Sequence, residues 1–183
     1  MPYEPPPELA GLSLAQIAEL VAARKLPPVT SWTPDRSGDS EMRITADGRW
    51  FHQGGEITRP AMIRAFSGLL RRDANDSYWL VTPQEKLSIE VEDVPFTAVE
   101  MQSEGAGEAR NLAFRLNSDD LVIAGPDHAI EARPLPYLHV RDGLWARIAR
   151  PVYYELAEAA LAEGNNPPGL WSNGAFFALG YAA

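Results

Sequence analysis

The sequence predicts an α+β protein built from two related lobes, each an antiparallel sheet with a helix. Three observations favour this class. Two segments share one order of motifs, several strands follow one another between the last two expected helices, and no regular β-α-β alternation occurs. Because a duplicated unit buries its apolar face against a neighbour, we expect a seam between the lobes. Ligands often bind at such seams.

The repeated order is Asp-Gly-x-Trp, Ile-x-Arg-Pro, an apolar helical segment and an aromatic strand, over residues 47–80 and again over 142–171. In both copies 19 positions separate the proline from the aromatic strand. We therefore divide the chain into residues 1–83, an N-terminal helix with the first lobe, and residues 84–183, the second lobe. The second lobe combines barrel-like strands with a helix, an order loosely like a pleckstrin-homology domain.

Capping residues and prolines predict where three helices begin. Ser13 and Gln16 form a capping box at the start of the first helix, and Pro27 follows its end. Pro60 and Pro151 occupy the first turn of the other two helices, where a missing N–H removes no hydrogen bond.

Alternating apolar residues predict the strands, and residues 87–92 alternate most regularly. The Asp-Gly pairs at 47–48 and 142–143 favour hairpins with type I′ turns, in which both central residues have positive φ. Residues 30–40 are rich in Ser, Asp, Pro and Gly and are expected to be a linker. The other strands are expected at residues 42–46, 49–52, 78–82, 95–101, 112–116, 121–124, 129–133, 137–141 and 144–148.

Composition excludes several classes of function. The 183 residues carry a formal net charge of −9, which disfavours binding to a nucleic acid polymer because phosphate backbones attract positive surfaces. The chain has no cysteine, so disulfides and thiolate metal sites are excluded. No apolar run of about 18 residues is present to span a membrane. Residues 1–7 are Pro-rich, are expected to be extended and lack signal-peptide features, so we expect a soluble cytoplasmic protein.

Charged and aromatic residues near the expected seam are candidates for ligand binding. Arg59 precedes a helix start, where free backbone N–H groups attract anions. Arg141 and Arg147 flank the second Asp-Gly turn, and Phe96 and Tyr137 adjoin prolines that would shape a pocket. A solvated surface is the alternative interpretation of these charges. The candidate ligand-binding residues are Arg59, Glu85, Lys86, Glu92, Asp93, Phe96, Tyr137, Arg141 and Arg147.

Two segments with distinctive motifs adjoin the expected division. Residues 78–86 read Tyr-Trp-Leu-Val-Thr-Pro-Gln-Glu-Lys, and residues 91–96 read Val-Glu-Asp-Val-Pro-Phe. With Pro-Tyr-Leu-His-Val-Arg at 136–141 and Ser-Asn-Gly-Ala-Phe-Phe at 172–177, they resemble an uncharacterised, mostly proteobacterial family classed as a domain of unknown function. The resemblance implies a duplicated α+β core and a C-terminal half superficially like a pleckstrin-homology domain. It also implies a lobe-interface site for a nucleotide-like ligand and a role in signalling.

The leading hypothesis is a non-enzymatic ligand-binding or regulatory protein that holds a small anionic, nucleotide-like ligand at the lobe interface. The three histidines lack the spacings of zinc sites, so neither a metal nor a cofactor is predicted. One alternative is a metal-assisted hydrolase that uses Glu92, Asp93 and His128. The other is an adaptor that binds a protein partner through the barrel-like lobe and residues 1–7.

Overall fold

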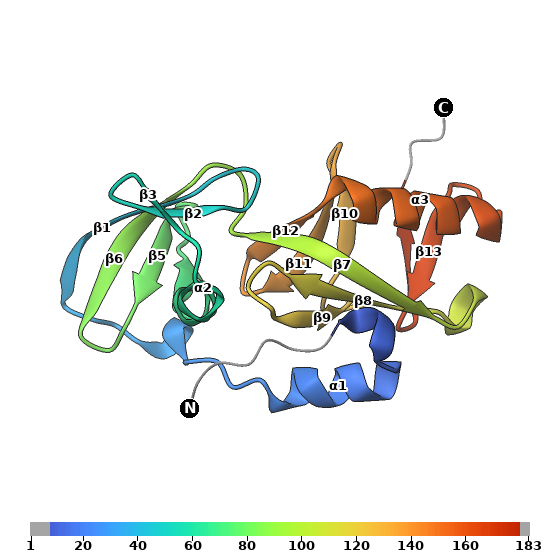
Figure 1. Ribbon diagram of the computed structural model, residues 1–183, viewed down its shortest axis with the longest axis horizontal. Helices are drawn as coiled ribbons and strands as arrows, with labels where there is room; N and C mark the ends of the chain where they lie inside the picture. The colour runs from blue at the N-terminus through green and yellow to red at the C-terminus, as the bar shows by residue number, and fades with distance from the viewer. Residues whose placement is uncertain (1–7, 180–183) are drawn as a thin grey trace.

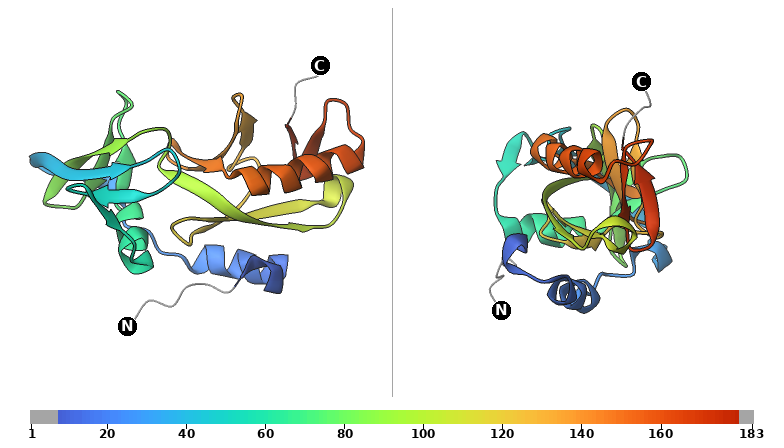
Figure 2. Two further views of the ribbon diagram at one scale, coloured as in Figure 1. Left: turned by 45° about the horizontal axis from the view of Figure 1, so that its top comes forward. Right: turned by 90° about the vertical axis from the view of Figure 1, so that its right-hand side faces the viewer.

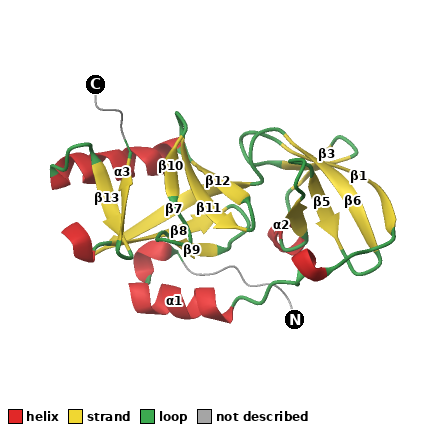
Figure 3. Cartoon of the chain, turned by 180° about the vertical axis from the view of Figure 1, so that it is seen from behind, coloured by secondary structure: helices red, strands yellow, loops and turns green. Residues whose placement is uncertain are grey.

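The structure is a computed structural model that describes residues 8–179, and these residues form two lobes placed side by side (Figure 1). The Pro-rich segment 1–7, for which an extended conformation is expected, lies outside them. Strands make up most of both lobes, and the helices lie at the periphery (Figure 3). Among residues 8–179, no helix is both long and apolar enough to span a bilayer.

The first lobe follows the N-terminal helix, and its elements run consecutively along the chain. Ser13 caps α1 through the expected capping box with Gln16. The elements up to the end of the first lobe are η1 (Leu9–Gly11), α1 (Leu14–Ala23), η2 (Val29–Ser31), β1 (Arg36–Ile44), β2 (Trp50–His52), β3 (Gly55–Ile57), α2 (Pro60–Ser67), β4 (Leu70–Arg72), β5 (Tyr78–Val81) and β6 (Glu85–Val91).

The second lobe ends with a long helix and a separate hairpin. Its third helix begins at the expected Arg-Pro pair and ends at Gly164, which has a left-handed φ of 72°. The elements are β7 (Phe96–Glu104), η3 (Gly107–Ala109), β8 (Asn111–Leu116), β9 (Leu121–Ile123), β10 (Ile130–Ala132), β11 (Pro136–Arg141), β12 (Leu144–Ile148), α3 (Arg150–Glu163), β13 (Gly169–Ser172) and β14 (Ala175–Ala178).

The two lobes repeat one sheet topology. The strand orders are β3-β2-β1-β6-β5-β4 and β9-β8-β7-β12-β11-β10, so each strand of the first sheet corresponds to the strand six positions later. Each sheet joins two antiparallel meanders through one central parallel pair, β1 with β6 or β7 with β12. The duplication is therefore confirmed, and the sheets are antiparallel as expected except for this one central parallel pair in each. The intervening strands provide the long crossover that a parallel pair requires.

The repeated motifs do not mark equivalent positions in this topology. The Asp-Gly pair at 47–48 joins β1 to β2, but the pair at 142–143 joins β11 to β12, which correspond to β5 and β6. Likewise, α2 lies between β3 and β4, whereas α3 follows the sixth strand of its sheet. The motifs reflect the residues that turns and helix starts prefer, and they recur at different places in the two lobes. Because β6 pairs with β1 and β5, the first lobe extends past the division expected after residue 83.

The two Asp-Gly turns also differ from each other. Asp142 and Gly143 have φ of 46° and 76°, as a type I′ turn requires. At the first turn only Gly48 has a positive φ, 85°, and Thr45 and Arg49 close a three-residue loop through the Thr45 N to Arg49 O hydrogen bond of 2.9 Å. The type I′ prediction is therefore wrong for the first hairpin. A three-residue loop with Gly in the left-handed region is the next common solution.

The expected linker over residues 30–40 is also partly wrong, because β1 begins at Arg36. The first residues of β1 are exposed, so their polar side chains do not reveal that the backbone forms a strand. This part of the backbone pairs in parallel with β6. A bulge between Asp39 and Met42, with Glu41 at a φ of 57°, separates this polar half from the buried half.

One apolar core runs through both lobes. Its cluster includes Trp50 and Ile44 of the first lobe together with Phe96 and Leu116 of the second. In the second lobe, α3 and α1 lie on opposite sides of the strands (Figure 2). A small separate cluster of Leu9, Ile17 and Ala113 fixes the N-terminal helix to β8.

Gly48 allows us to test how closely the lobes pack. A methyl group at Gly48 would collide with the Thr97 hydroxyl and lie 3.2 Å from the Asn117 side-chain nitrogen of the second lobe, whereas one at Gly54 would meet nothing within 4 Å. Both residues have positive φ, 85° and 82°. We expect Gly54→Ala to lower the free energy of unfolding by about 1 kcal/mol through backbone strain alone. Gly48→Ala should lower it by an additional ~1–3 kcal/mol of overpacking, measured by urea denaturation. Equal losses would contradict this packing.

Candidate functional site

A polar pocket of about 260 Å³ lies at the junction of the two lobes. We call it the seam pocket. The edge of the first sheet, the linker after β6 and the β10–β12 region of the second sheet each contribute side chains. It is lined by Arg72, Tyr78, Asp93, Val94, Arg133, Tyr137 and Trp145.

Tyr137 and Asp93 connect the second lobe to the interlobe linker within this pocket. The Tyr137 hydroxyl donates to the two Asp93 carboxylate oxygens at 3.2 and 3.0 Å. Burial raises the pKa of Tyr137 above its ordinary value, and the Asp93 carboxylate raises it further. Burial also raises the pKa of Tyr78. Both phenols therefore stay protonated at neutral pH and can act as hydrogen-bond donors.

Two arginines give the seam pocket its positive charge. Arg72 Nη1 donates to the Gly143 carbonyl oxygen at 2.9 Å, which joins β4 to the β11–β12 turn across the seam, and its Nη2 donates to Asp76 at 2.8 Å. The Arg133 guanidinium lies over the Trp145 ring, 4.3 Å from its centroid. Its Nε lies 3.0 Å from Glu131, and both side chains are about half exposed. Such an exposed ion pair contributes little, so an anion can compete with Glu131 for Arg133.

Two further contacts hold the lobes together outside the seam pocket. The Asp120 carboxylate of the second lobe accepts from Arg24 Nε at 2.7 Å and Arg64 Nη1 at 3.4 Å, which lie at the end of α1 and on α2. Arg141 Nη2 donates to the Ser67 carbonyl oxygen at the end of α2, at 2.9 Å. These contacts fix the orientation of the lobes and hence the shape of the pocket.

Three of the residues selected from the sequence lie at or next to the seam pocket. Asp93 and Tyr137 line it directly. Arg147 is paired with Tyr137 across β11 and β12, and its charge acts to lower the pKa of that phenol.

Arg141 and Phe96 occupy the seam but do not line the pocket. Phe96 is 1% exposed and belongs to the core, so no ligand reaches it. The Arg141 guanidinium lies over the Phe96 ring, 5.3 Å from its centroid. Burial lowers the pKa of Arg141, and the nearby Asp120 carboxylate opposes that effect. Arg141 therefore acts as an interlobe contact.

The structure places the other four candidates away from the seam pocket. Glu85 lies beside a cavity under α2, and Lys86 lies 3.5 Å from Asp73. The Glu92 carboxylate accepts from the Ala46 backbone N–H at 2.8 Å, within the first lobe. Arg59 is the exposed residue before α2 and makes no side-chain capping hydrogen bond.

A wider hollow of about 490 Å³ lies on the first lobe, and its lining includes Arg71 and Lys86. Asp73 pairs with both of these cations, at 2.8 and 3.5 Å. Arg71 Nη1 also donates to two backbone carbonyl oxygens, of Val29 and Trp32. These charges stabilise the lobe, so the hollow is a weaker candidate for an anion site.

Sequence reasoning missed five residues of the seam pocket: Arg72, Tyr78, Val94, Arg133 and Trp145. Two signals were available for them. Arg72 lies beyond the apolar stripe of α2, and Arg133 is a charged residue next to a proline at the end of a strand. Neither signal indicates that the two arginines meet, because that depends on how the lobes are oriented.

Metal-binding geometry is absent from the part of the chain that the structure describes: no three His, Asp or Glu side chains converge there as they would around an ion. His128 and His139 lie close together, with ring centroids 6.4 Å apart. Their Nδ1 atoms lie 3.2 and 3.1 Å from the carbonyl oxygens of His139 and Asp127, so these two rings join neighbouring backbone segments.

Comparison with known proteins identifies relatives for both lobes. Residues 27–94 match the family described as a domain of unknown function (DUF1285), N-terminal domain, and residues 95–179 match the DUF1285 C-terminal domain. A DUF1285 family protein from Silicibacter pomeroyi DSS-3, solved by crystallography, is 40% identical with a TM-score of 0.78, over 91% of this chain and 95% of that chain.

A second solved structure and one negative finding complete these comparisons. A DUF1285 family protein from Shewanella baltica OS155 is 24% identical with a TM-score of 0.50, over 68% of this chain and 93% of that chain, and supports the fold alone. No curated protein matches the sequence. The two family domains meet between residues 94 and 95, in the linker that separates the two sheets.

The Tyr137–Asp93 contact predicts a measurable titration. Because Asp93 raises the pKa of Tyr137 but burial raises it more, Asp93→Asn should lower this pKa while leaving it above the ordinary value. Phenolate absorbance titration would measure the change, with Tyr137→Phe identifying the signal and the exposed Asp35→Asn as control. An unchanged or higher pKa would contradict the contact. The pKa of Tyr137 is raised in the folded protein. The contribution of this phenol to stability should therefore be fully present below about pH 10 and be lost as pH rises through the folded pKa.

Proposed function

The chain belongs to the DUF1285 family, and we propose that this protein is a non-enzymatic ligand-binding or regulatory protein that holds a small anionic ligand between its lobes. The seam pocket is the observation that supports this proposal, because it gathers two arginines and three aromatic side chains at one junction. A nucleotide-like ligand combines the two features that such a pocket recognises, a negative group and a planar ring. A signalling role follows naturally for a protein that binds without catalysis.

The chemistry of the pocket supports an anion with a ring. Arg72 and Arg133 would bind a phosphate or carboxylate through charge-assisted hydrogen bonds. Trp145 carries the Arg133 guanidinium over its face, and a planar base that enters the pocket would stack on this guanidinium. Asp93 accepts the Tyr137 hydroxyl and can also accept from a ring N–H. The overall charge of −9 does not prevent this, because a local group of arginines acts at short range.

The size of the pocket limits the ligand. Its volume of about 260 Å³ lies just below the ~300–1,000 Å³ usual for drug-sized ligands. We therefore expect a mononucleotide or a smaller ring with one anionic group, and not a dinucleotide. Because residues on both lobes line the pocket, the bound ligand would stabilise the lobe arrangement, which is how a regulatory protein reports binding.

The two alternative functions gain less support. A metal-assisted hydrolase needs Glu92, Asp93 and His128 to converge on one ion, but Glu92 accepts from the Ala46 N–H and the His128 ring contacts the His139 carbonyl oxygen. An adaptor would use residues 1–7, which lie outside the described residues, and a barrel-like second lobe. We also propose that this lobe is similar to a pleckstrin-homology domain. We further propose that the protein is bacterial and cytoplasmic.

Arg133 provides the direct test of ligand binding. Isothermal titration calorimetry against nucleoside mono- and diphosphates and cyclic nucleotides should find at least one that binds. Arg133→Ala should then weaken its binding by about 10–100-fold, because a hydrogen bond to a charged group contributes about 1.5–3 kcal/mol. Arg133 is half exposed, so the fold should be unaffected.

Arg150→Ala, at the exposed start of α3, is the matched control and should bind as the native protein does. If no compound in the panel binds, or if both alanine variants weaken binding equally, the proposed function is wrong.

A further inference from the structure

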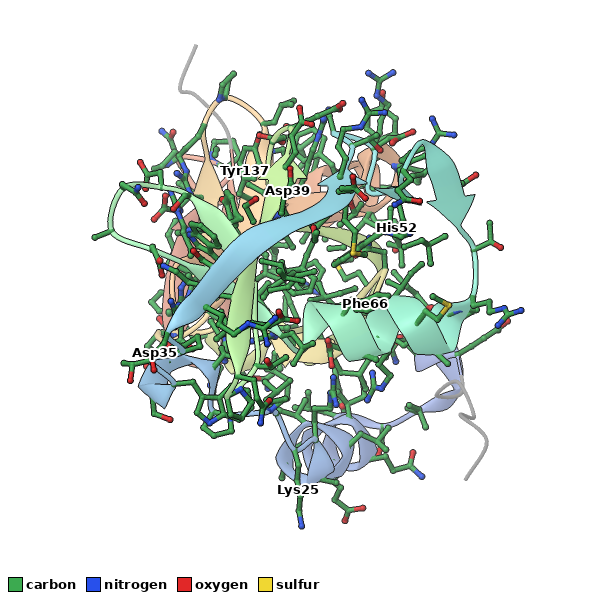
Figure 4. The ribbon with its side chains drawn as sticks, turned by 90° about the vertical axis from the view of Figure 1, so that its left-hand side faces the viewer. Lys25, Asp35, Asp39, His52, Phe66 and Tyr137 are labelled. Atoms are coloured by element: carbon green, nitrogen blue, oxygen red, sulfur yellow. The ribbon has the colours of Figure 1, made fainter. Side chains whose placement is uncertain are left out.

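The first lobe also contains a cavity whose lining differs chemically from that of the seam pocket. It has a volume of about 350 Å³ and lies between α2 and the sheet. We call it the α2 cavity. Figure 4 views this lobe from its far end and labels Phe66 on α2, with His52 above the helix. Most of its lining is apolar and includes Met42, Ile57, Met62, Phe66, Leu80 and Leu87.

The cavity arises because α2 is too short to cover its sheet. A helix of eight residues is about 12 Å long, whereas six strands about 4.8 Å apart span about 24 Å. The sheet therefore has apolar side chains that the helix does not reach. In the second lobe α3 has 14 residues, and α1 covers the opposite side.

The contacts of α2 keep this cavity from collapsing. Met62 and Phe66 lie four residues apart, on the side of α2 that lines the cavity. Arg64 Nη1 donates to the Ser118 carbonyl oxygen and to Asp120, and the Ser67 carbonyl oxygen accepts from Arg141. The helix is thus held by the second lobe and cannot move onto the sheet. A preformed apolar cavity of this kind is typical of a ligand site.

The cavity is also open to solvent and lacks partners for its apolar atoms. Met62 is 37% exposed, so apolar side-chain surface is accessible to solvent at the opening. Removing apolar surface from water is favourable, so a hydrocarbon ligand that covers this surface would be stabilised. Two of the lining side chains are methionines, which adapt to apolar ligands of varied shape.

Four polar residues border the cavity, and two of them are already occupied. The Ser40 hydroxyl donates to the Ser88 carbonyl oxygen at 2.7 Å, and the Thr82 hydroxyl donates to the Glu85 carbonyl oxygen at 3.2 Å. Among the residues that the structure describes, the Glu85 carboxylate forms an ion pair with Arg36 alone, at 3.9 Å, and the Arg36 side chain is 79% exposed. Within residues 8–179, no hydrogen bond or ion pair involves the His52 ring. The groups open to a ligand are therefore one carboxylate and one imidazole.

We propose that the α2 cavity binds an amphiphile whose hydrocarbon chain fills the cavity and whose cationic ammonium head pairs with Glu85. The carboxylate accepts hydrogen bonds and cannot donate them, so it selects a donor. The net charge of −9 favours a cation and disfavours a fatty acid anion. This site does not depend on the anion site between the lobes.

Displacement of a neutral fluorescent probe tests the proposal in the full-length protein. N-phenyl-1-naphthylamine should bind, and decylamine, decanol and decanoate should be compared as competitors below their micelle-forming concentrations. Decylamine should compete best and decanoate at least tenfold less well. Glu85→Gln should weaken decylamine about tenfold and leave decanol unchanged.

Two cavity variants locate the binding. Met62→Trp at the opening and Ile57→Trp at the edge strand should each reduce probe binding at least tenfold, and circular dichroism would verify that each folds. Leu161→Trp, on the 71% exposed face of α3, and Arg133→Ala should leave it unchanged. The proposal is overturned if the probe does not bind, if neither cavity variant reduces binding, or if decanoate competes as well as decylamine.

Discussion

The buried Asp120 carboxylate is the contact on which the arrangement of the molecule depends. Its side chain is only 7% exposed, and it accepts from Arg24, Arg64 and the Ser118 hydroxyl. Removing one partner from a buried ion pair typically costs about 3–5 kcal/mol, because the remaining charge is left desolvated. The N-terminal helix, the first lobe and the second lobe must therefore come together for this one charge to be compensated.

This constraint explains why both candidate sites are preformed. Arg64 lies on α2, so the contact that orders the lobes also fixes the helix that forms one wall of the α2 cavity. The same lobe orientation brings Arg72 of β4 against the Gly143 carbonyl and places it in one pocket with Arg133 and Tyr137. The seam collects polar groups from two sheets of the same topology, and the cavity results from a short helix on a wide sheet. The two sites therefore differ in ligand chemistry for architectural reasons.

Features encoded by local interactions could be predicted from the sequence. The Ser13 capping box and the Asp142–Gly143 turn depend on neighbouring residues and were found where expected. The β1–β6 pair and the phase of the duplication depend on contacts between distant strands, which turn motifs do not report. The same holds for the site: Asp93 is part of a conspicuous motif, whereas Arg72 and Arg133 meet only after the lobes dock. The duplication was predicted correctly, but from motifs that are not equivalent.

Residual dipolar couplings of the backbone amides test the role of Asp120 most directly, because they report the orientation of each sheet independently. In the native protein, the couplings of β1–β6 and of β7–β12 should fit one alignment tensor. In Asp120→Asn, each sheet should still fit its own tensor, but the two tensors should differ because the lobes reorient. Two different tensors in the native protein, or a single shared tensor in the folded variant, would contradict the account.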